Sequence, residues 1–435
     1  MTPQERISVA VACIGGFISA ASMSLVSIAA PRIARDLHAS PAAVGWVLTV
    51  YLLGLSAFLV TAGRLADIVG KKRVYTAGFV ILGVGSVGCA LAPTLPVLIA
   101  ARLTQSVGAA ALSATGPAII TAAFPPEKRA RGLGYLLTGT YLGLTFGPSL
   151  GGMLTTVIGW PAVFAAVACS AMVGLLLSLR FLPVDEARDT PAKAIDPAGA
   201  VILGAGLVAV SLALRTDALL PPWSWALIGG AAFVLYVRHA RHHPTPVFSL
   251  ALLRTRAFAV GLAGTIVMYV VIFIQAWLLP FYLQNELHLG PGRAGLVMTA
   301  QPAMLALMAP ISGMLADRFG SRLPCVAAMV IVALGFVLVS RAAAHGELSV
   351  AAALLVVGAG AGLYSAPNSA MIMGAAPRTE QASAAAMAGT ARCFGMALGV
   401  AIAIALRARF SFSTSLVVAA GISLVGALFG AARPK

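Results

Sequence analysis

The hydropathy pattern of the chain is a series of long apolar runs separated by short polar breaks. Because a bilayer core about 30 Å thick is crossed by roughly 20 apolar helical residues, each run of that length predicts one membrane helix. Fourteen such windows are present: 7–29, 44–63, 73–93, 97–122, 132–155, 160–182, 197–215, 222–238, 257–283, 293–316, 323–341, 348–372, 383–406 and 411–432. The expected fold class is therefore an all-α membrane protein with fourteen transmembrane helices.

An internal duplication divides this pattern into two halves. The string GRLADIVGKKR at 63–73 returns in reduced form as GMLADRFGSR at 313–322, and both copies fall in polar breaks. The pairs at an offset of 250 residues are Thr49 with Thr299, Gly63 with Gly313, Asp67 with Asp317 and Gly70 with Gly320. Those at 252 residues are Pro125 with Pro377, Gly143 with Gly395 and Gly147 with Gly399. A match that runs through several helices predicts two bundles with the same topology.

The length of the offset predicts two additional helices between the bundles. Six helices with short loops occupy roughly 180 to 200 residues, so an offset of 250 residues leaves about 50 over. These residues lie between Asp196 and Arg254 and contain two apolar runs. We expect a six-helix bundle at 1–190, two linker helices at 191–255 and a second six-helix bundle at 256–435. The alternative for the insert is an amphipathic linker on the membrane surface.

Composition and charge place the chain in a membrane and orient it. With 60% hydrophobic and 10% charged residues, the chain has too little polar surface to cover a soluble core. The net charge of +16 could suggest nucleic acid as a partner, but its distribution follows topology instead. The predicted loops of one side carry 20 Lys and Arg residues and those of the other side carry seven. The positive-inside rule therefore predicts that both termini and both repeat strings are cytoplasmic.

Several function classes lack their sequence signatures. There is no nucleotide-binding GxxxxGK[ST] string, no HExxH string and no metal-like spacing among the five cysteines. We therefore expect neither an enzyme nor a primary pump, and no cofactor or metal site. The expected partners are the lipid bilayer and a small-molecule substrate, with no nucleic acid. Abundant Ala and Gly, and more Arg than Lys, indicate a bacterium with a GC-rich genome. The expected localisation is the bacterial inner membrane.

The repeated string resembles motif A of the Major Facilitator Superfamily of transporters. In physical terms, Gly63 permits close helix contact, Asp67 follows one turn later, and Gly70 lets the chain reverse before a basic cluster that can pair with the carboxylate. In that family the motif is regarded as a latch that holds the outward-facing state. The resemblance implies this role for Gly63, Asp67, Gly70 and Arg73, with Asp317 and Arg322 as a weaker second copy. The alternative is a solvated basic turn that only fixes topology.

The string GLTFGPSLGG in the fifth window resembles motif C, the antiporter signature of drug-exporting branches of that superfamily. Glycines at four-residue spacing let helix backbones approach closely, and a proline frees a carbonyl and bends the helix. The residues concerned are Gly143, Gly147, Pro148, Gly151 and Gly152. The resemblance implies a hinge between the halves and export rather than uptake, whereas the alternative is ordinary packing of small residues.

Two arginines lie inside predicted helices. Arg102, in RLTQSVGAAA, resembles the arginine of motif B, and Arg392 falls about 13 Å into the helix that starts near residue 383. A buried arginine in a membrane helix is unfavourable unless it faces a cavity or has a partner, so both are candidates for the charge of a substrate cavity. The alternative for each is a side chain that extends to the membrane surface.

The chain departs from the fourteen-helix, EmrB/QacA-like exporter branch at one informative position. That branch usually has LDxTIVNVALP in the first helix, and alignment on Pro31 puts Ser22 where the Asp stands. None of the 13 acidic residues and six histidines falls in a predicted membrane core. A proton-coupled exporter needs a group whose pKa can move across the working pH, and arginine does not titrate usefully. If transport is coupled to protons, Asp36, Glu286 or a carboxylate on the substrate is the better candidate carrier.

Polar and aromatic residues on the helices expected to surround the cavity form the remaining site prediction. They are Tyr51, Gln105, Tyr269, Gln275, Gln301, Tyr364 and Asn368, with Trp277 competing against Gln275 because residues two apart do not share a helix face. Each could instead be a satisfied core group. Together with the two arginines, they predict a neutral to positive cavity.

These observations lead to a functional hypothesis. We expect a secondary active transporter that exports small, fairly apolar, neutral or anionic compounds by alternating access, as in multidrug efflux, with proton coupling left open. The alternatives are a dedicated exporter of one endogenous metabolite and a membrane receptor or scaffold that does not transport.

Overall fold

The computed structural model describes residues 3–125, 128–183, 196–213, 221–243, 246, 248–342, 345–377 and 380–431, and all regular structure among them is helical. The first group of helices is α1 (Pro3–Asp36), α2 (Pro41–Val69), α3 (Lys71–Ala90), α4 (Leu95–Ala123), α5 (Arg129–Val157) and α6 (Pro161–Phe181). Next come α7 (Pro197–Ala213), α8 (Pro222–His242) and the short α9 (Leu250–Arg254). The last group is α10 (Arg256–Phe281) with a π-helical end η2 (Tyr282–Glu286), α11 (Pro291–Phe319), α12 (Arg322–Ala342), α13 (Glu347–Gly374), α14 (Gln381–Arg407) and α15 (Phe412–Ala431).

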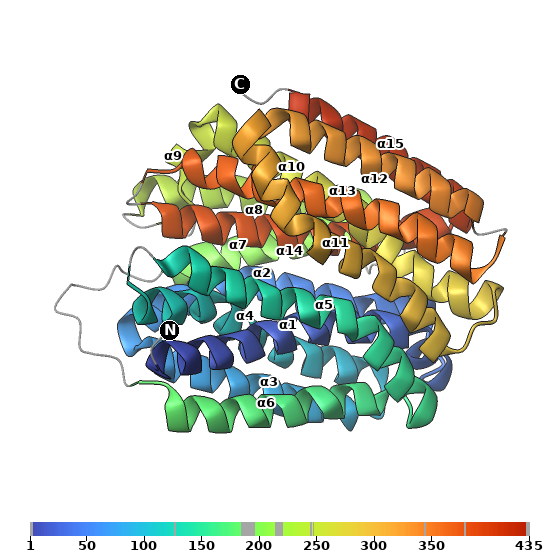
Figure 1. Ribbon diagram of the computed structural model, residues 1–435, viewed down its shortest axis with the longest axis horizontal. Coiled ribbons are helices and arrows are strands. Elements are labelled where there is room, and N and C mark those ends of the chain that lie inside the picture. The colour runs from blue at the N-terminus through green and yellow to red at the C-terminus, as the bar shows by residue number, and fades with distance from the viewer. Residues whose placement is uncertain are drawn as a thin grey trace.

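The helices form two groups of six that pack alike. Figure 1 shows α1–α6 together in the lower part of the molecule and α10–α15 in the upper part. In the first group α1 packs on α5, α3 on α4 and α3 on α6. In the second, α10 packs on α14, α12 on α13 and α12 on α15, which is the same arrangement. The predicted duplication is therefore present as a repeat of tertiary contacts.

The paired glycines of the repeat explain one of these contacts. A Cβ on Gly143 of α5 would collide with the Phe17 carbonyl of α1, and one on Gly395 of α14 would lie 2.7 Å from the Ile266 carbonyl of α10. Both glycines thus let a helix backbone approach its neighbour more closely than a side chain permits.

The turns of the two halves also repeat. Gly70, between α2 and α3, has φ of 105°, and Gly320, between α11 and α12, has φ of 71°. L-residues avoid this left-handed region, so the glycine of each string is required by the reversal of the chain. His38 and His288 have φ of 49° and 53°. They lie in DLHxxP and ELHxxP, which form a second repeat at the offset of 250 residues.

The insert between the halves contains α7 and α8, which pack against each other, and α7 also packs on α2 and α14. Each of the fourteen predicted windows overlaps one long helix. Ten helices of the described chain are long and apolar enough to cross a membrane, while α7 is a shorter apolar helix of 17 residues. The structure thus shows a multi-pass helical membrane protein.

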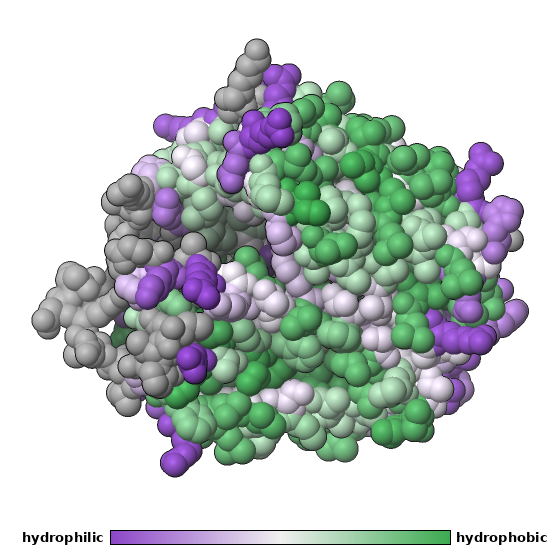
Figure 2. Space-filling model, viewed as in Figure 1, coloured by the Kyte–Doolittle hydropathy of each residue, from purple (hydrophilic) through white to green (hydrophobic). Residues whose placement is uncertain are grey.

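The outer surface fits a lipid environment. Figure 2 shows apolar residues over the broad middle of the molecule and hydrophilic residues gathered toward its two ends. Large apolar side chains exposed on this surface include Leu176 on α6, Leu227 on α8 and Leu424 on α15. An apolar belt between polar ends is what a bilayer stabilises.

Some of the acidic and basic residues counted above lie outside the described part of the chain. They are the acids Glu127, Asp185, Glu186, Asp189 and Asp217, and the basic residues Arg188, Lys193, Arg215, Arg378, Arg433 and Lys435.

Candidate functional site between the two halves

The two halves are in close contact at the end of the molecule where α5 ends and α11 begins. A Cβ on Gly152 would collide with the Pro291 carbonyl, and one on Gly295 would collide with the Pro148 carbonyl. The Gly292 amide donates to Thr156 Oγ1 at 3.0 Å. At the same end, Gln284 Nε2 donates to the Ile28 carbonyl at 2.8 Å and joins η2 to α1.

The halves separate toward the opposite end, where the repeat strings lie. A Cβ on Gly134 of α5 or Gly313 of α11 would meet no atom within 4 Å. Midway, Ser56 Oγ of α2 donates to the Thr390 carbonyl of α14 at 3.3 Å, and this is a contact between halves. Figure 2 shows the surface hollowed between the two halves toward the end that carries the N-terminus. The described conformation is thus closed at one end and open at the motif A end.

The glycines of the fifth helix face two different neighbours. Gly143, Gly147 and Gly151 lie against α1, where a Cβ on Gly151 would be 2.8 Å from the Leu25 carbonyl. Gly152 faces α11 instead. The string resembling motif C therefore packs α5 against its own half and against the other half at once, and Pro148 lies where α5 and α11 touch.

Arg102 is completely buried inside the first half. Its Nε donates to the Val47 carbonyl at 3.0 Å, and its Nη1 donates to Ser22 Oγ at 3.3 Å and to Gln105 Oε1. The guanidinium carbon lies 4.1 Å from the centre of the Tyr51 ring, a cation–π contact. This side chain neither reaches the membrane surface nor faces a cavity in the described conformation.

The Arg102 cluster contains no carboxylate among the described residues. Ser22, which stands where the exporter branch has an Asp, supplies a hydroxyl instead. Gln105 Nε2 continues the chain to Ser86 Oγ at 2.7 Å, and Arg102 Nη2 has no hydrogen-bond partner in the described part of the chain. The hydrogen-bond partners that hold the Arg102 guanidinium are thus neutral groups.

Arg392 has a different environment. It is an exposed residue of α14, eleven positions after Gln381 and hence ~16 Å along the helix. Its guanidinium faces the hydroxyl of Tyr269 on α10, and Tyr141 of α5 is close to both. Because α5 belongs to the other half, the exposed guanidinium faces the space between the halves rather than lipid. This is the accessible positive charge of the site.

The other predicted lining residues divide by exposure. Tyr269 and Gln301 are partly exposed, whereas Tyr51, Gln105, Gln275, Tyr364 and Asn368 are buried. Asn368 Nδ2 donates to Thr265 Oγ1 at 2.7 Å, and Tyr364 donates to Asn368 Oδ1 at 3.2 Å, so these groups cross-link α13 with α10. Tyr51 donates to the Ser19 carbonyl at 3.1 Å. Their roles toward a substrate remain predictions.

The described acids lie at helix ends. Arg32 Nε pairs with Asp36 at 3.0 Å, and Arg407 Nη2 pairs with Glu286 at 2.8 Å, both at the closed end of the molecule. Each pair is well exposed, so neither carboxylate is presented to the space beside Arg392 in this conformation.

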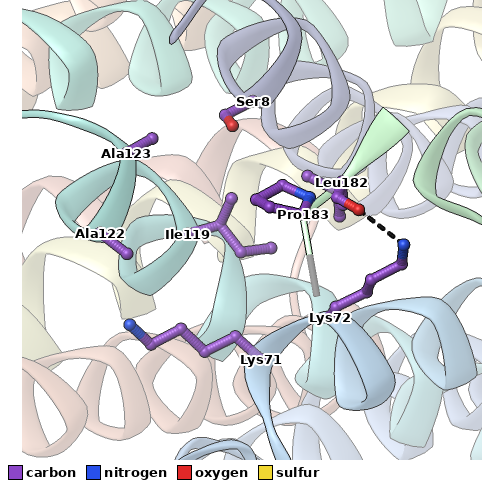
Figure 3. Close-up of a pocket in the computed structure, with 8 residues that line it drawn as sticks. All are labelled: Ser8, Lys71, Lys72, Ile119, Ala122, Ala123, Leu182 and Pro183. Atoms are coloured by element: carbon purple, nitrogen blue, oxygen red, sulfur yellow. Dashed lines mark hydrogen bonds between the residues drawn. The ribbon is translucent and has the colours of Figure 1, made fainter. Parts of the chain in front are cut away.

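Residues of the first string resembling motif A contact other helices at the open end. Lys72 Nζ donates to the Leu179 and Leu182 carbonyls, at 3.1 and 2.6 Å, and so caps the end of α6. Figure 3 shows the small cavity beside this contact, lined by Ser8, both lysines of the string, Ile119 and the residues around Leu182. Its volume of about 80 Å³ is far below the several hundred Å³ that a drug-sized molecule needs. Asp67, Arg73, Asp317 and Arg322 are all exposed.

Arg64 of the same string makes a contact that its sequence gave no reason to expect. Its Nη2 donates to the Pro246 carbonyl at 2.8 Å, which ties α2 to the segment after α8. Pro246 lies 182 residues further along the chain, and no sequence motif links it to Arg64.

Comparison with known proteins identifies the family. The model of the Major Facilitator Superfamily matches residues 12–251 and 261–434. The chain belongs to this superfamily. It is therefore a transporter by family membership, and the halves described above are the two bundles of that fold.

Several named relatives align with most of this chain. The riboflavin transporter RibZ of Clostridioides difficile is 31% identical over 92% of this chain and 87% of its own length. The multidrug resistance protein Stp of Mycobacterium tuberculosis is 30% identical over 87% of this chain and 71% of its own length. The drug efflux pump JefA of the same species is 28% identical, covering 92% and 80%.

Solved structures of transporters share the fold. A peptide transporter POT in complex with alafosfalin matches with a TM-score of 0.74 at 17% identity, covering 98% of this chain and 93% of its own. A D-xylose-proton symporter matches with a TM-score of 0.72 at 14% identity, covering 98% and 97%.

Proposed function

We propose that this Major Facilitator protein is a secondary active exporter of small, fairly apolar, neutral or anionic compounds. The observation that carries the proposal is the exposed Arg392 between the halves, beside Tyr269 and Tyr141. Described acids lie only at helix ends, so the positive charge has no nearby carboxylate to offset it. A lipophilic dication would be repelled in such a space, whereas an acceptor group on an aromatic substrate would gain charge-assisted hydrogen bonds.

The proposed mechanism is alternating access. The closed contact of α5 with α11 and the open end at motif A together describe one state, accessible from the side we assign to the cytoplasm. Export then requires the α5–α11 contact to open and the motif A end to close. Asp67, Arg73, Asp317 and Arg322 are the proposed latch of that second state, and the motif C glycines are the proposed hinge.

The proposed membrane arrangement has fourteen spans and two cytoplasmic termini in a bacterial inner membrane. Positive charge in alternate loops supports the orientation. The long α5 and α8 and the apolar α7 and α15 support the four additional crossings beyond the ten that length and hydropathy identify.

We further propose that no carboxylate of the first helix carries protons here. Ser22 occupies the position of the exporter branch's Asp, and it contacts Arg102 as a neutral acceptor. Asp36 and Glu286 are the remaining candidates on this chain, and both are engaged in surface ion pairs. A substrate carboxylate is the alternative proton carrier.

Flux into proteoliposomes with and without a pH gradient tests the proposal. Riboflavin, which is neutral, and fluorescein, which is anionic, serve as fluorescent probes, and a riboflavin relative makes the first probe a natural choice. We expect flux of at least one probe. Flux of a single compound only would favour the dedicated metabolite exporter, and no flux of any compound would favour the non-transporting receptor or scaffold.

A further inference from the structure

Three metal-ligating side chains meet at the cytoplasmic ends of the two inserted helices. Asp196 precedes α7, while His239 and His243 lie one turn apart at the end of α8. One ligand atom from each residue lies within 4.8 Å of the other two. His239 Nε2 and Asp196 Oδ1 are 2.7 Å apart, and the two imidazole rings stack with centroids 5.3 Å apart.

We propose that Asp196, His239 and His243 bind a divalent transition-metal ion, with Zn²⁺ as the representative. Two imidazoles and one carboxylate are a common three-ligand set for this ion, and water completes the tetrahedron. A His pair at i and i+4 places both rings on one helix face, which suits a shared ion. The ion would then join the start of α7 to the end of α8.

The burial of Asp196 places a pre-positioned carboxylate at this site. Its side chain is only 1% exposed, whereas that of His239 is 24% exposed. A buried carboxylate is costly unless it is paired or coordinates a metal, and in the described structure it is paired with His239, which the proposal makes a fellow ligand. Asp196 Oδ1 also accepts from the Gly199 amide at 2.7 Å and caps α7, which fixes the carboxylate in position before any ion binds.

Binding of Zn²⁺ at this site would require only small side-chain movements. Ligand atoms about 2.0–2.1 Å from Zn²⁺ in a tetrahedron are roughly 3.3 Å apart, so Oδ1 and Nε2 must separate slightly and the His243 ring must turn inward. Arg64 opposes the binding of a cation, because its positive charge lies near Asp196. The same guanidinium donates to the Pro246 carbonyl. The site is therefore expected to bind the ion reversibly rather than as a permanent structural centre.

A bound ion would stabilise the position of the inserted helices against motif A. Arg64 belongs to the motif A string of α2 and also contacts the segment after α8. Tyr236 of α8 is hydrogen-bonded to Phe248 in both directions, at 3.2 and 2.6 Å, so the same segment is tied to α8. The proposed site thus lies where the insert meets the latch.

Zinc titration of the purified full-length protein tests the proposal. The protein carries a tag without histidine, is stripped with a chelator, and is titrated with Zn²⁺ in competition with a chromophoric zinc indicator. We expect one ion per chain, and at least tenfold weaker binding for His239→Gln, for His243→Gln and for Asp196→Asn, which retains the helix cap. Zn²⁺ should also raise the melting temperature of the parent protein and not of these variants.

His242→Gln is the matched control. His242 belongs to the same turn of α8, but its Nδ1 lies 2.9 Å from the Arg238 carbonyl and it is exposed. This variant should bind Zn²⁺ as the parent does. Parent binding no tighter than that of His239→Gln, or equal weakening by His242→Gln, would overturn the proposal. Each variant's melting temperature without metal shows whether it is folded.

Discussion

At the scale of single residues, the two arginines inside the membrane helices have different environments. Arg102 is fully enclosed by Val47, Ser22, Gln105 and the Tyr51 ring. Arg392 is exposed between the halves. The sequence predicted that both arginines supply the charge of a substrate cavity, because the depth of a residue in a helix does not show which face of the bundle its side chain occupies.

This difference predicts a separation of stability from transport. Arg102→Ala removes several hydrogen bonds and a packed side chain, so it should lower the free energy of unfolding by about 2–4 kcal/mol. Arg392→Ala should leave the melting temperature within error and reduce flux. Thermal unfolding of both variants in the same detergent measures the first effect, and equal losses of stability would contradict the assignment.

Ser22 gives a second prediction at this scale. Ser22→Asp places a carboxylate beside Arg102 Nη1, which now lies 3.3 Å from the serine hydroxyl. We expect the flux of riboflavin in the variant to depend more steeply on a pH gradient than that of the parent, because the new group can bind and release protons. An equal dependence of parent and variant on the gradient would contradict the prediction.

At the scale of helices, close backbone contact between α5 and α11 holds the closed end. Gly152→Ala forces its Cβ into the Pro291 carbonyl, whereas Gly134→Ala on the same helix meets open space. A forced backbone shift costs about 1–3 kcal/mol, so Gly152→Ala should reduce flux about 5- to 150-fold by disfavouring the described state. Gly134→Ala gains the same helix propensity and should transport like the parent. Equal flux of the two variants would show that the contact has no role.

The crossing of α7 and α8 is a separate element-scale prediction. Pro221, the exposed residue before α8, should be extracytoplasmic, and Lys128 should be cytoplasmic. In a Cys169→Ser background, which removes an exposed thiol, Pro221→Cys should react with an impermeant maleimide in intact cells. Lys128→Cys should react only after permeabilisation. An unreactive Pro221→Cys in intact cells would favour the membrane-surface linker.

Sequence predicted the helices and their duplication well because both depend on local hydropathy and on repeated strings. The fourteen windows each overlap a helix, and Gly143 with Gly395 makes equivalent contacts in the two halves. The sequence did not predict the Arg64 contact with Pro246 or the contact of Asp196 with His239. These pairs are 182 and 43 residues apart, and only the packing of α7 and α8 brings them together.

At the scale of the whole molecule, we propose a transporter with a positive, acid-poor path between its halves. Family membership supports transport, and the described conformation is open toward motif A. The proposed substrate preference rests on the accessible charge of Arg392 and on the placement of the described acids at helix ends.

Uptake into everted membrane vesicles tests this claim most directly. Fluorescein, riboflavin and the dication propidium are compared in the parent, in Arg392→Gln and in the control Arg341→Gln, which alters an exposed arginine at the end of α12. The account predicts uptake of fluorescein or riboflavin but not of propidium. Arg392→Gln should lose about 10- to 100-fold of the fluorescein flux, as expected for a charge-assisted hydrogen bond, and Arg341→Gln should lose none. High-affinity uptake of propidium, or fluorescein flux unchanged in Arg392→Gln, would contradict it.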